Sequence, residues 1–321
     1  MGLGSVVSSY EVLLATWNGS AYLEQQLDSI LGQTQPPIRL LIADDGSSDD
    51  TLELIQVWHQ RTRFPMRVLP PVPERLGSCR TFERLLEASS AAYVMPADQD
   101  DIWDSDKAER LLAATLDLEM RFGSEHPLLV HSDLRLINAQ GDPLAASFIR
   151  YQHLCPGQND WLEIAMQNVV TGCSCLLNRA CVQESLPFPP EAVLHDWWLA
   201  LVAARCGAIG YLPQASVSYR QHGSNLVGAK GVSAQYRRRL YQLLEHNPAE
   251  SWIGPGLRQL QACQKRFPGV DPQKVRALAQ LSSSSAWRRL RAALWLGLKK
   301  HGVWRTMGFY VALLAWQSKR P

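Results

Sequence analysis

Short apolar segments alternate with amphipathic segments along the first 121 residues, and this alternation constrains the fold more than any other feature of the chain. The apolar segments are almost continuously hydrophobic and predict strands at residues 11–16, 39–43, 66–69 and 92–96. The segments between and after them have helical spacing and predict helices at residues 21–31, 50–60, 81–89 and 106–121. Continuous apolar strands are typical of parallel sheets that are buried on both faces. We therefore predict an α/β fold, with a mostly parallel sheet flanked by helices.

Charge divides the chain into two parts. Residues 235–321 contain sixteen Lys and Arg against three Asp and Glu, a net charge of +13, whereas the preceding residues carry −11 and the whole chain +2. The sign changes near residues 228–231, so we predict a main domain at residues 1–230 and a basic helical C-terminal extension at residues 231–321. The main domain loses its regularity after about residue 133, where mixed elements are expected at residues 160–168, 174–177, 196–206 and 215–219.

Composition excludes several classes of protein. A content of 46% hydrophobic and 19% charged residues fits a packed core and excludes a disordered or collagen-like chain. The seven cysteines show no CxxC spacing, which predicts reduced thiols. The N-terminus has no basic region before a long apolar run, and no stretch reaches the roughly 18–20 apolar residues of a membrane span. We therefore predict neither a secretory signal nor a transmembrane helix, and a cytoplasmic location.

Polar clusters follow three of the predicted strands, at residues 16–19, 44–47 and 98–101. In an open α/β sheet, ligands bind beyond the carboxyl ends of the strands. Two of these clusters are acidic and would repel each other at one edge of the sheet, so a cation or a hydrogen-bond donor should lie between them. A metal ion with a phosphate ligand satisfies that requirement, and Mg²⁺ or Mn²⁺ prefers oxygen ligands. The alternative is that these aspartates only form turns and cap helices.

Six short segments together resemble a known family. They read LATWNG at residues 14–19, ADDGSSD at 43–49, DQDDIW at 98–103, TGC at 171–173, HDWW at 195–198 and YRQHGSN at 219–225. The sequence resembles the family-two inverting glycosyltransferases of the GT-A fold over about residues 10–228. The last two segments point to a branch that includes bacterial rhamnosyltransferase-like enzymes of surface polysaccharide assembly. The resemblance implies a nucleotide-sugar half at about residues 1–133 and an acceptor half at about residues 134–230.

The resemblance also implies roles for individual residues. Thr16 and Asn18 border the nucleotide, Asp44 hydrogen-bonds the base, and Asp98 faces the ribose. Asp100 holds the Mg²⁺ or Mn²⁺ ion that bridges the diphosphate, where a divalent cation acts as a Lewis acid on the leaving group. The remaining assigned residues are Gly77 and Trp103 in the nucleotide-sugar site and His222 as a further metal ligand. The loop of Gly77 departs from the family pattern, because Arg75 and Thr81 stand near positions where relatives often carry asparagine.

Inverting transfer also needs a general base that takes a proton from the acceptor hydroxyl, and Asp196 is the candidate. It opens an apolar helix, whose N-terminus favours the carboxylate, whereas burial raises the pKa; the two effects compete. The alternative is that Asp196 only caps the helix. The neighbouring His195 is either a supporting partner or a surface residue.

Other polar and aromatic residues of these segments keep two interpretations each. His222 contacts the metal or the diphosphate, or is structural, and Arg220 is a candidate to face phosphate. Trp103, Trp197 and Trp198 either stack on sugar faces or pack in the core.

The basic extension interleaves Lys and Arg with aromatic residues, among them Trp295, Trp304 and Phe309. This pattern favours an anionic membrane surface, with rings at the interface and basic side chains at the headgroups. A helical cap on the main domain and a nucleic-acid surface are the alternatives. We favour the membrane and expect no nucleic-acid partner, because the acidic main domain would repel nucleic acid. The expected partners are therefore a nucleoside-diphosphate sugar, a glycan or lipid-linked oligosaccharide acceptor, and the cytoplasmic face of the inner membrane.

The sequence supports two competing classes of protein less well. A nucleotide-binding oxidoreductase would carry G-x-G-x-x-G at the first strand–helix turn, and this turn lacks it. A non-catalytic nucleotide-sugar-binding or scaffold protein of the same fold needs no chemistry, whereas this chain keeps Asp98, Asp100 and Asp196.

Overall fold

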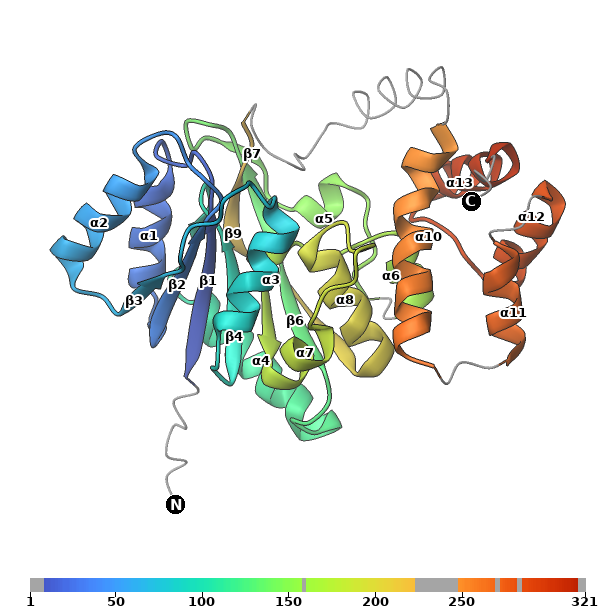
Figure 1. Cartoon of the computed structure of the whole chain (residues 1–321), viewed down its shortest axis with the longest axis horizontal. Coiled ribbons are helices and arrows are strands. Elements are labelled where there is room, and N and C mark those ends of the chain that lie inside the picture. The colour runs from blue at the N-terminus through green and yellow to red at the C-terminus, as the bar shows by residue number, and fades with distance from the viewer. Residues whose placement is uncertain (1–8, 158–159, 223–247, 269–271, 282–284, 317–321) are drawn as a thin grey trace.

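The computed structural model describes residues 9–157, 160–222, 248–268, 272–281 and 285–316 (Figure 1). The strands are β1 Tyr10–Thr16, β2 Arg39–Asp44, β3 Met66–Val68, β4 Tyr93–Asp98, β5 Ile102–Trp103, β6 Leu128–Ile137, β7 Pro143–Ala145, β8 Cys175–Asn178 and β9 Ala208–Arg220. The helices of the main domain are α1 Leu23–Leu31, α2 Thr51–Thr62, α3 Ser78–Ala88, α4 Lys107–Phe122, α5 Phe148–Tyr151, α6 Trp161–Met166, α7 Arg179–Ser185 and α8 His195–Cys206, with the short 3₁₀ helix η1 Gly172–Ser174. The C-terminal helices are α10 Pro248–Arg266, α11 Pro272–Gln280, α12 Ala286–Trp295 and α13 Val303–Ala315.

One mixed sheet contains all of these strands, in the order β3-β2-β1-β4-β8-β6-β9-β5, with β7 beside β6. The predicted α/β fold with flanking helices is confirmed. The four strands expected from the first half form its parallel part, because β3, β2, β1 and β4 all pair in parallel. Beyond β4 the sheet is mixed: β8 pairs antiparallel with both β4 and β6, whereas β9 runs parallel to β6.

The register of the parallel part brings the polar clusters together. β1 lies between β2 and β4, where Thr16 pairs with Asp44 and Ala15 with Asp98. Both faces of the sheet are covered, because Leu13 of β1 belongs to one buried cluster while Val12 and Leu14 belong to the other. Successive side chains of a strand point to opposite faces, so the continuous apolar runs of the sequence are explained by burial on both sides.

The C-terminal helices pack on the main domain and share its core. Ile253, Leu257 and Leu260 of α10 and Phe309 of α13 belong to the same buried cluster as Trp198 of α8. Figure 1 shows α10 beside α6 and α8. The backbones of α10 and α6 approach closely, because a Cβ atom on Gly256 would lie 2.5 Å from the carbonyl oxygen of Ala165. The described C-terminal helices therefore form a helical cap on the main domain, which was one of the alternatives left open by the sequence.

Polar contacts fasten the same interface. The Nζ atom of Lys300 donates to the carbonyl oxygen of Met166 over 2.8 Å, and Arg305 donates to that of Gln152 over 2.7 Å. Basic residues that the sequence assigned to lipid headgroups thus include some that bind the protein itself. The domain boundary at residues 228–231 lies outside the described residues, and the division at residue 230 stays a prediction. Among the described residues, no helix is both long and apolar enough to cross a membrane.

The expected membrane insertion of Phe309 is wrong, because its side chain is fully buried. We expect Phe309→Ala to lower the free energy of unfolding by about 3–5 kcal/mol, the usual cost of such a truncation in a core. Trp304→Ala on the same helix is the matched control; Trp304 is 73% exposed, so its change should stay within about 0.5 kcal/mol. Urea unfolding measures both. Equal effects of the two variants would contradict the packing of α13 described here.

Candidate active site

The Asp44 carboxylate, at the end of β2, is saturated by hydrogen bonds. Thr16 Oγ1 and Ser47 Oγ donate to its Oδ2 over 2.7 and 2.6 Å, and the backbone N–H groups of Gly46 and Ser47 donate to its Oδ1 over 3.1 and 2.8 Å. A carboxylate offers about four lone-pair positions, and all are used. Asp44 thus forms a turn, as the alternative interpretation of these aspartates expected. The base-binding role stays a prediction, and it requires Ser47 or Thr16 to turn away.

Side chains tie the loops after β1, β2 and β4 to one another. The backbone N–H of Asn18 donates to Ser47 Oγ over 2.8 Å, and Asn18 Oδ1 accepts from the N–H of Ser48 over 2.8 Å. The Gln99 amide pairs with both backbone groups of Trp17, accepting over 2.8 Å and donating over 2.9 Å. The three polar clusters therefore form one edge, as the strand order requires.

The loop that departs from the family pattern is held by Asp45. Its carboxylate accepts from the N–H groups of Leu76 and Gly77 over 2.7 and 2.8 Å. Gly77 has a φ of +78°, in the left-handed region that favours glycine. The Arg75 guanidinium lies 3.4 Å from the centroid of the Trp17 ring, and its Nε lies 3.4 Å from Asp45. Arg75 thus links this loop to the loop after β1.

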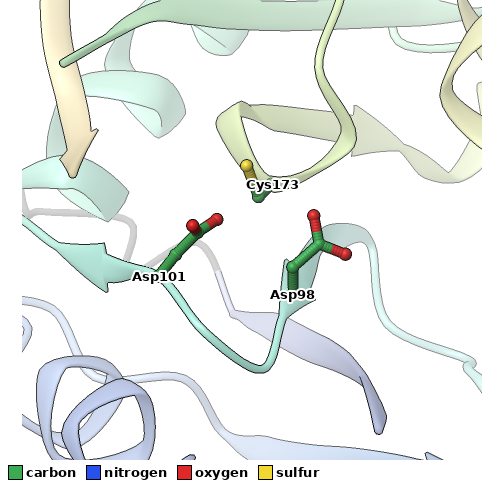
Figure 2. Close-up of side chains that lie close together, drawn as sticks. All are labelled: Asp98, Asp101 and Cys173. Atoms are coloured by element: carbon green, nitrogen blue, oxygen red, sulfur yellow. The ribbon is translucent and has the colours of Figure 1, made fainter. Parts of the chain in front are cut away.

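Three side chains converge at the acidic end of β4 (Figure 2). Asp98 ends the strand, Asp101 follows in the next loop, and Cys173 comes from η1; one ligand atom of each lies within 4.8 Å of the others. Burial raises the pKa of Asp98, and the negative charges of Asp100 and Asp196 raise it further. Burial also raises the pKa of Cys173 well above its ordinary value. Burial therefore favours the neutral thiol of Cys173 over the thiolate.

Lys107 supplies a buried amino group beside this cluster. It begins α4, its Nζ donates to the carbonyl oxygen of Cys173 over 2.7 Å, and the same atom lies 3.1 Å from the centroid of the Trp103 ring. Burial lowers the pKa of Lys107, and the charges of Asp101 and Asp98 act in the opposite direction. The amino group beside Asp98 and Asp101 is thus supplied by a residue of the chain itself.

Arg220, at the end of β9, supports the same loop from the other side. Its backbone N–H donates to Asp101 Oδ1 over 3.1 Å, and its Nε donates to the carbonyl oxygen of Asp100 over 2.8 Å. The guanidinium also donates to Ala139 and Gln25, and the residue is 2% exposed. The expectation that Arg220 faces a phosphate is therefore not met, because its donors are engaged by the protein.

The two residues predicted to bind metal, Asp100 and His222, lie together. His222 Nε2 is 2.7 Å from Asp100 Oδ2, although the residues are 122 positions apart. Asp101 Oδ2 is buried and has no hydrogen-bond partner among the described residues. Carboxylate oxygens suit Mg²⁺ or Mn²⁺, and the imidazole is the softer ligand of the set. The donor set at this edge therefore fits the expected divalent ion.

Asp196, the predicted base, lies in the first turn of α8. The N-cap position belongs to Leu194, so Asp196 is not the N-cap residue. Its Oδ1 accepts from Asn168 Nδ2 and its Oδ2 from the N–H of Gly172, both over 3.2 Å. Burial raises its pKa from 3.8 to about 6, although hydrogen bonds from Gly172 and from the start of its own helix act against the shift. Burial thus prevails over the helix N-terminus.

The aromatic candidates are mostly core residues. Trp103 is 4% exposed under Lys107, and Trp198 is fully buried, so neither ring is open to a sugar; the predicted place of Trp103 in the nucleotide-sugar site is corrected to packing. Trp197 is half-buried and donates through Nε1 to Ile164. His195 is buried, not a surface residue, and its ring stacks on Phe82 at 3.7 Å between centroids.

Several residues of this edge have no role in the assignments made from the sequence: Asp45, Gln99, Asp101, Lys107 and Cys173. Asp101 and Cys173 lie inside segments that carry the resemblance to the family, so these motifs could have indicated a role for them. Lys107 carried no such signal, since a lysine at the start of a helix is ordinarily exposed.

Comparison with known proteins agrees with the fold. Residues 11–120 match the family described as Glycosyl transferase family 2. The dTDP-rhamnosyl transferase RfbG of Shigella flexneri is 26% identical over 230 residues, covering 70% of this chain and 77% of that protein. The putative teichuronic acid biosynthesis glycosyltransferase TuaG of Bacillus subtilis is 23% identical over 237 residues, covering 73% and 87%.

Solved structures show the same architecture. S. aureus TarS 1-349 in complex with UDP-GlcNAc has a TM-score of 0.52 and 13% identity, over 96% of this chain and 90% of that chain. The mannosyltransferase PcManGT from Pyrobaculum calidifontis, in complex with GDP-Man and Mn²⁺, has a TM-score of 0.52 and 16% identity, over 95% and 85%. The chain has the GT-A fold of these glycosyltransferases. Residues 11–120 form a glycosyl transferase family 2 domain, and the chain is a glycosyltransferase.

Proposed function

We propose that the chain transfers a sugar from a nucleoside diphosphate to a glycan or lipid-linked acceptor, with inversion at the sugar, in bacterial surface polysaccharide assembly. The observation that carries the proposal is the convergence of Asp98, Asp100 and His222 with a buried Asp196 of raised pKa. The Asp196 charge contributes to the raised pKa of Asp98, and His222 lies 2.7 Å from Asp100, which supports a base close to the donor edge. RfbG and TuaG, whose names refer to rhamnosyl transfer and teichuronic acid, support the polysaccharide context.

The donor is held at the edge formed by β1, β2 and β4. Asp44, Thr16 and Asn18 lie at the nucleotide end, and Gly77 lies beside them through its bond to Asp45. Asp100 and His222 would hold Mg²⁺ or Mn²⁺, with Asp101 as a further oxygen ligand near them. A bound divalent ion supplies Lewis-acid stabilisation of the leaving diphosphate. Mn²⁺ and GDP-Man in the PcManGT structure support this assignment.

Asp196 takes the proton from the acceptor hydroxyl. A base works best when its pKa is close to the working pH, and a value of about 6 makes Asp196 a much stronger base than an ordinary aspartate. Asn168 and the N–H of Gly172 hold the carboxylate in place, so that its orientation is fixed before the acceptor binds.

The acceptor side comprises residues 134–230, and the reaction takes place at the cytoplasmic face of the inner membrane. The basic extension supports this location, since its charge of +13 attracts anionic lipid.

A thermal-shift and turnover assay tests the function. Nucleoside diphosphates with Mn²⁺ or Mg²⁺ should raise the melting temperature, and a panel of nucleotide sugars should yield product on lipid-linked acceptors. Stabilisation without turnover of any sugar would identify a non-catalytic binding protein instead. Stabilisation only by a dinucleotide would favour an oxidoreductase.

A further inference from the structure

Helix α13 carries two apolar faces, and only one of them is buried. Phe309, Ala312 and Leu313 pack into the core. The other face, here called the outer stripe, consists of Val303, Trp304, Met307, Val311 and Leu314, which are 72%, 73%, 54%, 59% and 37% exposed. At 3.6 residues per turn these five positions lie within an arc of about 100°. A surface helix of a globular protein ordinarily has a polar outer face, so the outer stripe is not explained by folding.

The part of the chain that carries the outer stripe is basic. No Asp or Glu follows Asp271 in the sequence, whereas α12, which packs against α13, carries exposed Arg288 and Arg291. Trp287 and Trp295 of α12 are also 75% and 53% exposed. Exposed apolar and aromatic side chains with basic neighbours are complementary to an anionic lipid surface.

The length of α13 decides how it can meet lipid. Its thirteen residues span about 20 Å, whereas the hydrocarbon core of a bilayer is about 30 Å thick. The helix is therefore too short to cross and is suited to lie flat. Figure 1 shows α11, α12 and α13 at the end of the molecule opposite β2 and β3, away from the nucleotide end of the sheet.

We propose that the outer stripe of α13 docks on an anionic lipid bilayer, with Arg288 and Arg291 at the headgroups and Phe309 holding the helix to the protein. This inference deepens the proposed function by naming the surface that brings the enzyme to a membrane acceptor. It differs from simple insertion of the whole extension, because the buried face of α13 remains in the core.

Sedimentation with vesicles tests the docking surface. The full chain should bind vesicles of phosphatidylglycerol and phosphatidylcholine in equal amounts, and bind pure phosphatidylcholine at least tenfold less. The double variant Met307→Glu/Val311→Glu should lose about tenfold or more of the binding, because two charges enter the apolar contact. Arg288→Glu/Arg291→Glu should also weaken binding, and raised salt should weaken the wild type.

Met120→Glu is the matched control, since Met120 is 78% exposed on α4, remote in sequence from the stripe. It should bind vesicles like the wild type. Binding of the Met307→Glu/Val311→Glu variant equal to that of the wild type would overturn the proposal, as would a wild type that ignores anionic vesicles. Conversion of a dimer to a monomer by this variant, without any lipid binding, would show that a second copy covers the stripe and would also overturn it.

Failure of the docking surface and failure of the proposed function are distinguishable. Transfer to a soluble acceptor analogue should be unchanged in the Met307→Glu/Val311→Glu variant, because the stripe lies outside the donor and base residues. Lipid binding without any transfer by the wild type would refute the function and leave the docking surface standing.

Discussion

Asp196→Asn should lower the rate of transfer by about 10²–10⁴ at saturating donor, the usual contribution of general acid–base catalysis. The substitution keeps the size of the side chain and its bond from the N–H of Gly172, but it removes the ability to accept a proton. Donor affinity should change little, because the base acts on the acceptor. Steady-state kinetics with donor titration, together with binding of the nucleoside diphosphate, measure both quantities.

The pH dependence gives a second readout of the same residue. Because burial raises the pKa of Asp196 to about 6, the wild-type rate should fall by about tenfold per unit of pH below 6. An ordinary aspartate would keep its activity down to about pH 4. The residual rate of Asp196→Asn should lack this acid limb.

Acid unfolding linked to the titration of Asp196 does not explain the loss of rate below pH 6. A folded-state pKa above the unfolded value makes the folded state relatively more stable below pH 3.8, and that contribution is lost as the pH rises through about 6. If Asp196→Asn loses donor binding and keeps its rate at saturation, the residue belongs to the donor site and its role as base is wrong.

Asp100→Asn should nearly abolish transfer while the fold is retained. The substitution removes one negative charge and one oxygen ligand at the place where charge develops on the leaving diphosphate, and His222 loses its charged partner. The expected result is loss of turnover together with loss of the metal-dependent stabilisation by nucleoside diphosphate. Activity assays and thermal shifts with and without Mn²⁺ measure it.

Asp117→Asn is the matched control for this variant, since Asp117 is an exposed aspartate on α4. It removes the same charge from the chain and should leave both readouts at wild-type values. Near-normal turnover of Asp100→Asn at saturating Mn²⁺ or Mg²⁺ would remove Asp100 from the metal site.

The sequence predicted the first half of the fold closely, because that half is local. Each strand there is a continuous apolar run and each helix has its own periodicity, so β1, β2, β3 and β4 begin and end within about two residues of the prediction. The parallel order of these strands then placed Asp44 and Asp98 on either side of the end of β1. The sequence could not predict that β8 and β9 complete a mixed sheet, since pairing between distant strands leaves no periodic signal.

Burial decided between the interpretations that the sequence left open for single residues. Trp103, Phe309 and Trp304 are all aromatic. Only packing shows that the first two are buried and that Trp304 is exposed. The same holds for ionisable groups: Lys107 is an ordinary helix residue in the sequence, whereas in the fold its amino group is buried beside Asp98 and Asp101 and its pKa is lowered to about 7.

Contiguous residues were therefore enough to predict the α/β class, the resemblance to glycosyl transferase family 2 and the acidic edge, because strand periodicity and motif spacing are local properties. Tertiary structure alone decided what each side chain of that edge is able to do. It placed His222 beside Asp100 across 122 positions and put Asp196 where burial outweighs its helix N-terminus. It also turned one face of α13 into the core and the other outward. Solvation and distance set these outcomes, and both depend on neighbours that are remote in the chain.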